Sequence, residues 1–275
     1  MSIRLAARGV EAGYPTMPGV LREVTLEVRQ GRRLALLGAN GSGKTTLLKS
    51  LSGALPVQSG QVVTAAGVLS YDRAGLRAHR QRVQLVLQDP DDQLFSGDVA
   101  SDVAFGPLNL GLDREEVEQR VRQACDLLGI SELAQRPIHH LSYGQRKRVA
   151  IAGAVAMRPD VLLLDEPTAG LDPAGVTAML HTLEAMEQAG TSVVLSTHDV
   201  ALAWEWADEA AIVGGGGVRL GPVTKILTDP ELVSASALVL PWQVALLDSL
   251  GITPRQWPRS VADIARILAG PPISR

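Results

Sequence analysis

Short runs of hydrophobic residues recur along the chain, and longer stretches with helical periodicity separate most of them. The runs are nearly unbroken, which is typical of parallel strands that helices cover on both faces. They predict strands at 34–37, 83–87, 161–164, 192–195 and 210–213. Strands that alternate with helices indicate βαβ crossovers, and the chain is therefore expected to have an α/β fold around a parallel sheet.

A different pattern lies near the start of the chain. Val24, Leu26 and Val28 alternate with polar residues. This period of two is typical of an antiparallel strand with one face in solvent. We expect the segment 61–70 to pair with it, which adds an antiparallel β subdomain to the parallel core.

Helix signals dominate the segment 89–158. The clearest helix extends from Asp113, an N-cap residue with Glu116 three positions later, to Gly129, and its apolar residues repeat at helical spacing. The single cysteine, Cys125, lies on that apolar stripe, and we expect an inert core thiol. One cysteine also excludes an intrachain disulfide and a multi-cysteine zinc cluster. The segment therefore predicts a mostly helical subdomain inserted in the α/β core.

Composition narrows the class of protein. Of 275 residues, 46% are hydrophobic and 20% are charged, which is ordinary for a globular protein, and the net charge of −3 provides no basic field that favours nucleic acid. Apolar runs such as 149–157 are far shorter than the roughly 20 residues that span a bilayer. The first residues lack the apolar centre of a secretory signal. We therefore expect a chain that does not itself cross a membrane.

The first motif with chemistry is GANGSGKTT, between the predicted strand at 34–37 and a helical stretch. Glycines in such a loop let backbone N–H groups point at phosphate oxygens, helped by the positive end of the helix. The lysine neutralises β- and γ-phosphate oxygens, and the first threonine binds Mg²⁺. The alternative is a plain glycine turn before a helix. The expected nucleotide-binding residues of this loop are Gly38, Asn40, Gly41, Ser42, Gly43, Lys44, Thr45 and Thr46.

The second motif is VLLLDE, which places two carboxylates at the carboxyl end of a buried strand. Open α/β sheets bind their ligands at this edge. We expect Asp165 to hold the metal and Glu166 to act as the base for water. On its own, the pair would more often be only the start of a loop.

The third motif is LSYGQ, in which Ser142 and Gln145 form a capping box that opens a helix ending before Pro159. Gly144 allows a ligand to approach the first turn. An ordinary capped helix is the alternative. Together with the other two motifs, this sequence resembles the signature of ATP-binding-cassette (ABC) proteins. In that family the signature of one subunit closes over the γ-phosphate held by the glycine loop of another, which implies a dimer in the active step.

Four further positions match that family. Gln88 matches the glutamine that senses Mg²⁺ and the attacking water, and His198 matches the switch histidine at the γ-phosphate. Asp172 matches the loop that crosses to the partner's site, with a helix cap as the alternative. Tyr14 matches the aromatic residue that stacks on adenine, with a simple X-Pro turn as the alternative. The resemblance covers about residues 1–220.

The segment 88–112 resembles the ATPase subunits of energy-coupling-factor importers, above all the cobalt type. In those importers it forms part of a groove that grips the coupling helices of a membrane scaffold subunit. A capped, half-buried helix is the alternative. The tail 218–275 also resembles that subfamily, and its apolar residues form a second dimer contact or pack on the core. These residues are Leu246, Leu247, Leu250, Ile264, Ile267 and Leu268.

The resemblance implies a cassette domain at 1–220, with the helical subdomain at about 89–158, and a C-terminal extension at 221–275. It implies ATP and Mg²⁺ as ligands and a homodimer or a heterodimer with a paralogue. A membrane scaffold and a substrate-capture subunit are the expected partners, at the cytoplasmic face of the membrane. The cargo, which the ATPase does not contact, is expected to be cobalt, with nickel or a vitamin left open.

Other classes fit less well. A DNA-repair cassette ATPase needs heptad arms or basic patches, and the run 146–148 is too short to serve. No nucleic-acid partner is therefore expected. A cassette-type translation factor needs two sets of motifs, and the chain has one. An enzyme with a metal or thiol centre needs a ligand cluster that the sequence does not offer.

Overall fold

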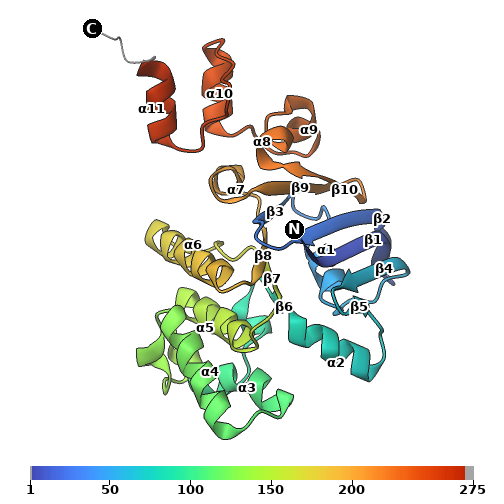
Figure 1. Ribbon diagram of the computed structural model, residues 1–275, viewed down its shortest axis with the longest axis vertical. Coiled ribbons are helices and arrows are strands. Elements are labelled where there is room, and N and C mark those ends of the chain that lie inside the picture. The colour runs from blue at the N-terminus through green and yellow to red at the C-terminus, as the bar shows by residue number, and fades with distance from the viewer. Residues whose placement is uncertain (1, 270–275) are drawn as a thin grey trace.

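The computed structural model describes residues 2–269 (Figure 1). Its strands form two sheets, one of four antiparallel strands in the order β2-β1-β4-β5 and one of six strands in the order β10-β9-β3-β8-β7-β6. The first sheet contains β1 (Ile3–Tyr14), β2 (Met17–Arg29), β4 (Ser59–Thr64) and β5 (Gly67–Val68). The second contains β3 (Leu34–Leu37), β6 (Val83–Val86), β7 (Val161–Asp165), β8 (Ser192–Ser196), β9 (Glu209–Gly214) and β10 (Gly217–Pro222).

The five predicted core strands are all present and pair in parallel, from β6 through β7, β8 and β3 to β9. Every residue of β3, β7 and β8 is buried. This burial on both faces explains the unbroken apolar runs. The sheet places the carboxyl ends of β3, β6, β7 and β8 along one edge, where the loops of the candidate site begin.

The predicted partner of the alternating strand is wrong. The long strand β1 lies between β2 and β4, so the segment 61–70 pairs with β1 and not with Val24–Val28. The alternation in β2 itself is confirmed, because Val24, Leu26 and Val28 are buried. Small residues and repeated register shifts interrupt the period of two in β1, which hid this strand from the pattern analysis.

Helices occupy the segment between β6 and β7, as expected, and lie at the bottom of Figure 1. The Asp113 carboxylate caps α4 by accepting from the Glu116 N–H at 2.8 Å. Cys125 is buried in the core, and burial raises the pKa of its thiol. The helices of this segment are α3 (Val99–Leu110), α4 (Arg114–Leu127) and α5 (Tyr143–Ala156), with short 3₁₀ helices at Pro90–Asp92, Ser131–Leu133 and Ile138–His140.

The remaining helices flank the sheets and form the C-terminal end of the molecule. They are α1 (Lys44–Leu51), α2 (Arg73–Arg82), α6 (Pro173–Gln188), α7 (Val200–Trp206), α8 (Val223–Ile226), α9 (Pro230–Ala235), α10 (Trp242–Ser249) and α11 (Val261–Ala269). Within residues 2–269, no helix combines the length and apolar character that a membrane span requires.

The tail does not begin as a separate unit. Its first residues form β10, which pairs with β9 through a turn in which Gly215 and Gly216 have positive φ. Further on, the Trp204 indole N–H on α7 donates to the carbonyl of Pro258 at 2.8 Å. The apolar residues of the tail pack on the core only in part, and a second dimer contact stays a prediction. Leu247 and Ile264 are buried, whereas Leu250 and Leu268 are about half exposed.

Candidate active site

The glycine loop connects β3 to α1, the order that the motif predicts. Gly38 has a φ of 149°, and an added Cβ would lie 2.4 Å from the carbonyl oxygen of Val213. Gly43, the N-cap of α1, has a φ of 105°. These backbone conformations are open to glycine and strained for other residues. The loop therefore brings bare backbone N–H groups to the N-terminus of α1, which suits an anion.

Lys44 folds back over this loop. Its side chain is 7% exposed, and its Nζ donates to the carbonyls of Gly38 at 2.8 Å and Ala39 at 3.2 Å. A buried ammonium group whose hydrogen bonds go to neutral carbonyls can still offer its positive charge to a phosphate. The Lys44 Nζ also lies 4.0 Å from the Glu166 Oε1.

Asp165 ends β7 and faces the loop. One carboxylate oxygen accepts from the Thr45 hydroxyl at 2.6 Å, and the other accepts from the Ser196 hydroxyl at 2.5 Å. Asp165 is 3% exposed. The Thr45 and Asp165 oxygens are hard donors in direct contact, and such donors suit a small octahedral cation such as Mg²⁺. In addition, the Ser42 hydroxyl is buried without a hydrogen-bond partner among residues 2–269. The donor set therefore fits a metal-bound phosphate ligand.

Glu166 follows directly and has a φ of 47°, which is unusual for a residue with a side chain. Its carboxylate is buried, and its Oε2 lies 3.0 Å from the His198 Nδ1. The His198 side chain is 65% exposed. A buried carboxylate between an ammonium group and an imidazole can accept a proton from a water molecule and stay oriented while it does so.

These residues surround one cavity of about 350 Å³. Gln88, two residues after β6, and Tyr14, the last residue of β1, border it from other elements. Gly38 and His198 do not line the cavity itself, but they contact Lys44 and Glu166, which do. The sequence-predicted residues that line it are Tyr14, Asn40, Gly41, Ser42, Gly43, Lys44, Thr45, Thr46, Gln88, Asp165 and Glu166.

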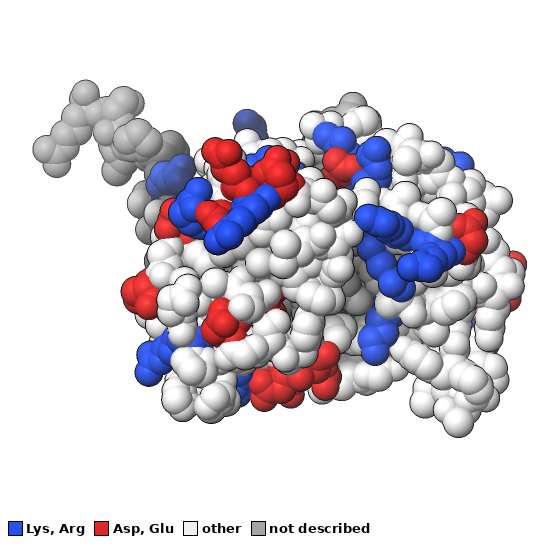
Figure 2. All heavy atoms as spheres, turned by 90° about the horizontal axis from the view of Figure 1, so that it is seen from below, with Lys and Arg blue, Asp and Glu red and all other residues white. Residues whose placement is uncertain are grey.

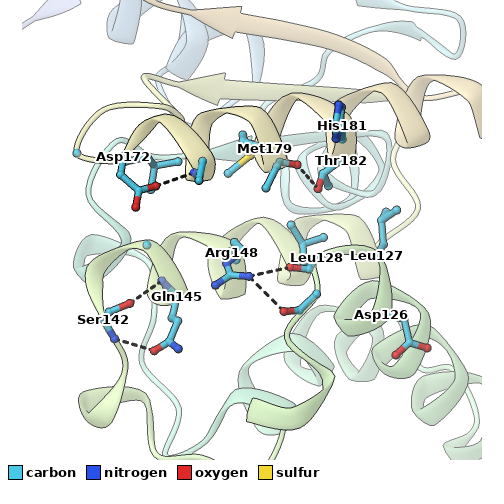
Figure 3. Close-up of a pocket in the computed structure, with 17 residues that line it drawn as sticks. Asp126, Leu127, Leu128, Ser142, Gln145, Arg148, Asp172, Met179, His181 and Thr182 are labelled. Atoms are coloured by element: carbon cyan, nitrogen blue, oxygen red, sulfur yellow. Dashed lines mark hydrogen bonds between the residues drawn. The ribbon is translucent and has the colours of Figure 1, made fainter.

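The other predicted residues lie elsewhere. Ser142, Gly144, Gln145 and Asp172 line a second cavity of about 780 Å³ between α5 and α6 (Figure 3). The capping box is present, since the Gln145 N–H donates to the Ser142 hydroxyl at 3.3 Å and the Ser142 N–H to the Gln145 side chain at 2.9 Å. Asp172 caps α6 by accepting from the Gly175 N–H at 2.7 Å. Within one chain, the structure does not bring these residues to the glycine loop.

Sequence reasoning missed three residues that support the site. Ser196 holds Asp165, Tyr143 donates through its hydroxyl to the Gln88 carbonyl at 3.2 Å, and Lys147 donates to the Glu166 carbonyl at 2.8 Å. Burial lowers the pKa of the Lys147 ammonium group to about 8, and the nearby Glu166 partly opposes that shift. Lys147 follows Tyr143 by one helical turn and precedes Ile151 by another. This spacing places a lysine on the buried stripe of α5, which is the signal that could have found it.

Comparisons with known proteins agree with this geometry. Residues 21–169 match the family described as ABC transporter. The cobalt import ATP-binding protein CbiO of Rhodobacter capsulatus is 48% identical over 243 residues, which cover 88% of this chain and 87% of that protein. The energy-coupling factor transporter ATP-binding protein EcfA of Methanosphaera stadtmanae is 41% identical over 251 residues, which cover 91% of this chain and 90% of that protein.

A solved structure supports the same assignment. The structure of cbiO1 from Clostridium perfringens, part of the ABC transporter complex cbiONQ, is 35% identical and has a TM-score of 0.76, covering 90% of this chain and 100% of that one. The expected fold, a mixed α/β cassette with an antiparallel sheet, is confirmed. The chain therefore belongs to the ATP-binding subunits of ABC transporters, and it is an ATPase.

Proposed function

We propose that this protein is the ATP-hydrolysing subunit of an energy-coupling-factor importer and that it works as a dimer with the nucleotide between two subunits. The observation that carries the proposal is the division of its motifs between two cavities. The glycine loop lines one cavity, and Ser142, Gly144 and Gln145 line another. A second subunit is needed to bring such a capped helix onto the phosphates.

The residues take the following roles in the proposal. Lys44 and the loop amides bind the phosphates, while Tyr14 stacks on adenine. Mg²⁺, when bound by Thr45, Asp165 and Gln88, offsets the charge of the phosphate oxygens. Glu166 accepts a proton from the attacking water, and His198 contacts the γ-phosphate and orients the Glu166 carboxylate.

Charge explains why closure controls hydrolysis. Phosphoryl transfer depends on alignment and charge stabilisation more than on covalent help. The helix N-terminus at Ser142, Gly144 and Gln145 of the partner subunit would supply N–H groups to the γ-phosphate, and Asp172 would lie in the loop that crosses to it. Groups supplied by a second protein accelerate comparable reactions by roughly 10³- to 10⁵-fold. Opening after cleavage is then the mechanical output.

A membrane scaffold subunit is the proposed receiver of that motion. Phe95, Phe105 and Leu108, near or on α3, are exposed, and the two phenylalanine rings meet edge to face with centroids 4.6 Å apart. Figure 2 shows the α3–α5 end of the molecule, where charged groups of both signs leave a broad uncharged area. Exposed apolar side chains that gather in one patch are typical of a protein-contact site.

The relatives support the wider part of the proposal. Cobalt is the proposed cargo because a CbiO protein is among them. We also propose a substrate-capture subunit in the importer and a position of this chain at the cytoplasmic face of the membrane. We propose residues 1–220 as the cassette, including the helical subdomain at about 89–158, and residues 221–275 as an extension. Whether the second subunit is a copy or a paralogue is an outcome of the test below.

Glu166→Gln tests the proposal. The amide keeps the shape of the side chain but cannot accept the proton, so we expect ATP binding within about twofold and hydrolysis at least about 100-fold slower. Sedimentation with ATP should show that the variant accumulates as a dimer. If the dimer forms only after a paralogue is added, it is a heterodimer. Glu115→Gln, on the exposed side of α4, is the matched control and should hydrolyse normally. Steady-state hydrolysis at the wild-type rate in Glu166→Gln would contradict the proposal.

A further inference from the structure

One buried cation lies beside the site without a role in the mechanism above. Lys147 on α5 is 1% exposed. Its Nζ donates to the carbonyls of Glu166 and Ala169, each at 2.8 Å. In the described part of the chain, no carboxylate lies within ion-pair distance of it. The Nζ also lies over the Tyr143 ring, 5.4 Å from its centroid. Burying a charge without an ion-pair partner is costly, so packing alone does not explain why a lysine occupies this position.

Lys147 holds one side of a strained peptide unit. Glu166 lies in the left-handed region with a φ of 47°. Its N–H donates to the carbonyl and hydroxyl of Ser196 at 3.2 and 3.1 Å, and its carbonyl accepts from Lys147 and from the Ala169 N–H. The main chain of Glu166 is therefore fixed by β8 on one side and by α5 on the other. Because the backbone conformation sets where a side chain starts, these contacts also aim the carboxylate at His198.

The same end of α5 contacts two other parts of the site. Tyr143, one turn before Lys147, donates to the Gln88 carbonyl. Its ring lies under Gly170, where an added Cβ would be 3.0 Å from the Tyr143 Cε1. Gly170 and Ala169 belong to the turn that leads from Glu166 to Asp172. The first turns of α5, the turn after Glu166 and the Gln88 loop thus form one connected unit.

We propose that Lys147 is a positioning residue for hydrolysis, whose ammonium group fixes the Glu166 main chain and connects it to the end of α5 that closes over the nucleotide of the partner. This inference rests on the proposed function. Lys147 does not touch the nucleotide cavity, so its loss should change the chemical step and leave nucleotide binding intact. It couples the signature helix of a subunit to the general base of the same subunit.

Lys147→Met tests this proposal, because methionine is unbranched and only one atom shorter than lysine, and it removes the donor. We expect the kcat for ATP to fall by about 10- to 100-fold, with the KM within twofold of wild type. Lys147→Gln restores a donor and should recover at least half of the loss on a logarithmic scale. Arg120→Met is the matched control, since Arg120 is a largely buried cation on α4 that donates to the Ala156 carbonyl at 3.4 Å, away from the site. It should leave the kcat unchanged.

A double-mutant cycle separates positioning from simple stability. In a Glu166→Gln background, Lys147→Met should cause no further loss of rate, and the ATP-dependent dimer should persist. If Lys147→Met does not fold, Lys147→Gln replaces it in the cycle, with a kcat reduced by about three- to tenfold as the expected result.

Three outcomes would overturn the inference. The first is a kcat within twofold of wild type in folded Lys147→Met, the second is a further fall in rate when Lys147→Met is added to Glu166→Gln, and the third is loss of the ATP-dependent dimer. Failure of the proposed function is distinguishable, because Glu166→Gln alone would then hydrolyse ATP normally.

Discussion

At the scale of single residues, the site is held together by short polar contacts between neighbouring strand ends. Ser196 at the end of β8 is fully buried and serves two neighbours, the Asp165 carboxylate and the Glu166 N–H. Its hydroxyl therefore holds the Asp165 carboxylate and the main chain of Glu166 in place. Ser192, at the other end of the same strand, is also buried, but its hydroxyl has no partner among the described residues.

This contrast gives a matched pair of variants. Ser196→Ala leaves a buried carboxylate oxygen unsatisfied, so we expect it to destabilise the protein by about 1–3 kcal/mol and to slow hydrolysis. Ser192→Ala removes a hydroxyl without a partner and should change the free energy of unfolding by less than about 0.5 kcal/mol. Denaturant unfolding and ATPase assays check both. Equal effects of the two variants would show that the hydroxyl of Ser196 does not hold the site.

At the scale of elements, a side chain of α2 is hydrogen-bonded to the end of α1, the helix that follows the glycine loop. The His79 ring is buried, and its Nε2 donates to the carbonyl of Leu51, the last residue of α1, at 2.8 Å. Desolvation lowers the pKa of His79 below its usual 6.5, and this effect outweighs the hydrogen bond to Leu51, which raises the pKa. A neutral imidazole is therefore part of the folded state.

Because the pKa of His79 is lowered in the folded state, the protein should become less stable as the pH falls. Below pH 6.5 the unfolded chain binds a proton at His79 that the folded chain resists, so the free energy of unfolding falls as the pH drops from 6.5 towards the lowered pKa of the folded state. His79→Gln should lower the Tm at pH 7.5, and the further loss of Tm between pH 7.5 and 5.5 should be smaller than in wild type by about 2 °C. His140→Gln, at an exposed position, is the control. An unchanged pH dependence of the Tm in His79→Gln would refute the argument.

At the scale of the whole molecule, the C-terminal end is part of the fold and also carries free apolar surface. Val223 and Leu227 belong to the core, and Arg259 donates to the carbonyl of Ala207 at 2.6 Å. Truncation after Gly221 would therefore uncover the core and cannot serve as a clean test of dimerisation. Point substitutions on the exposed face of the tail avoid this problem.

We expect Leu250→Lys combined with Leu268→Lys to weaken a nucleotide-free dimer. Both side chains are 51% exposed, so the free energy of unfolding should change little, while a buried dimer contact would lose apolar area and gain charge. Sedimentation equilibrium without nucleotide measures the effect, and an association constant at least about tenfold lower is the expected result. Val68→Lys, at an exposed apolar position on β5, is the control. Unchanged association in the double variant would place the contact elsewhere.

Much of this fold is visible in local patterns. The five parallel strands, the strand-loop-helix order of GANGSGKTT, the cap of α4 at Asp113 and the capping box of α5 at Ser142 all depend on residues within a few positions of one another. Spacing alone therefore predicts them. The grouping of Lys44, Asp165 and Glu166 also follows, because parallel strands place their carboxyl ends on one edge of the sheet.

The sequence by itself determined the chemistry of the candidate site, since the residue types and their order along the strands set which groups line the proposed phosphate cavity. Only the tertiary structure decided that β1 separates β2 from β4, that β10 joins the main sheet, and that Lys147 lies buried under Glu166. These features depend on contacts between segments far apart in the chain. A local pattern of hydrophobic and polar positions records which face of an element is buried, but it does not record which distant segment covers that face.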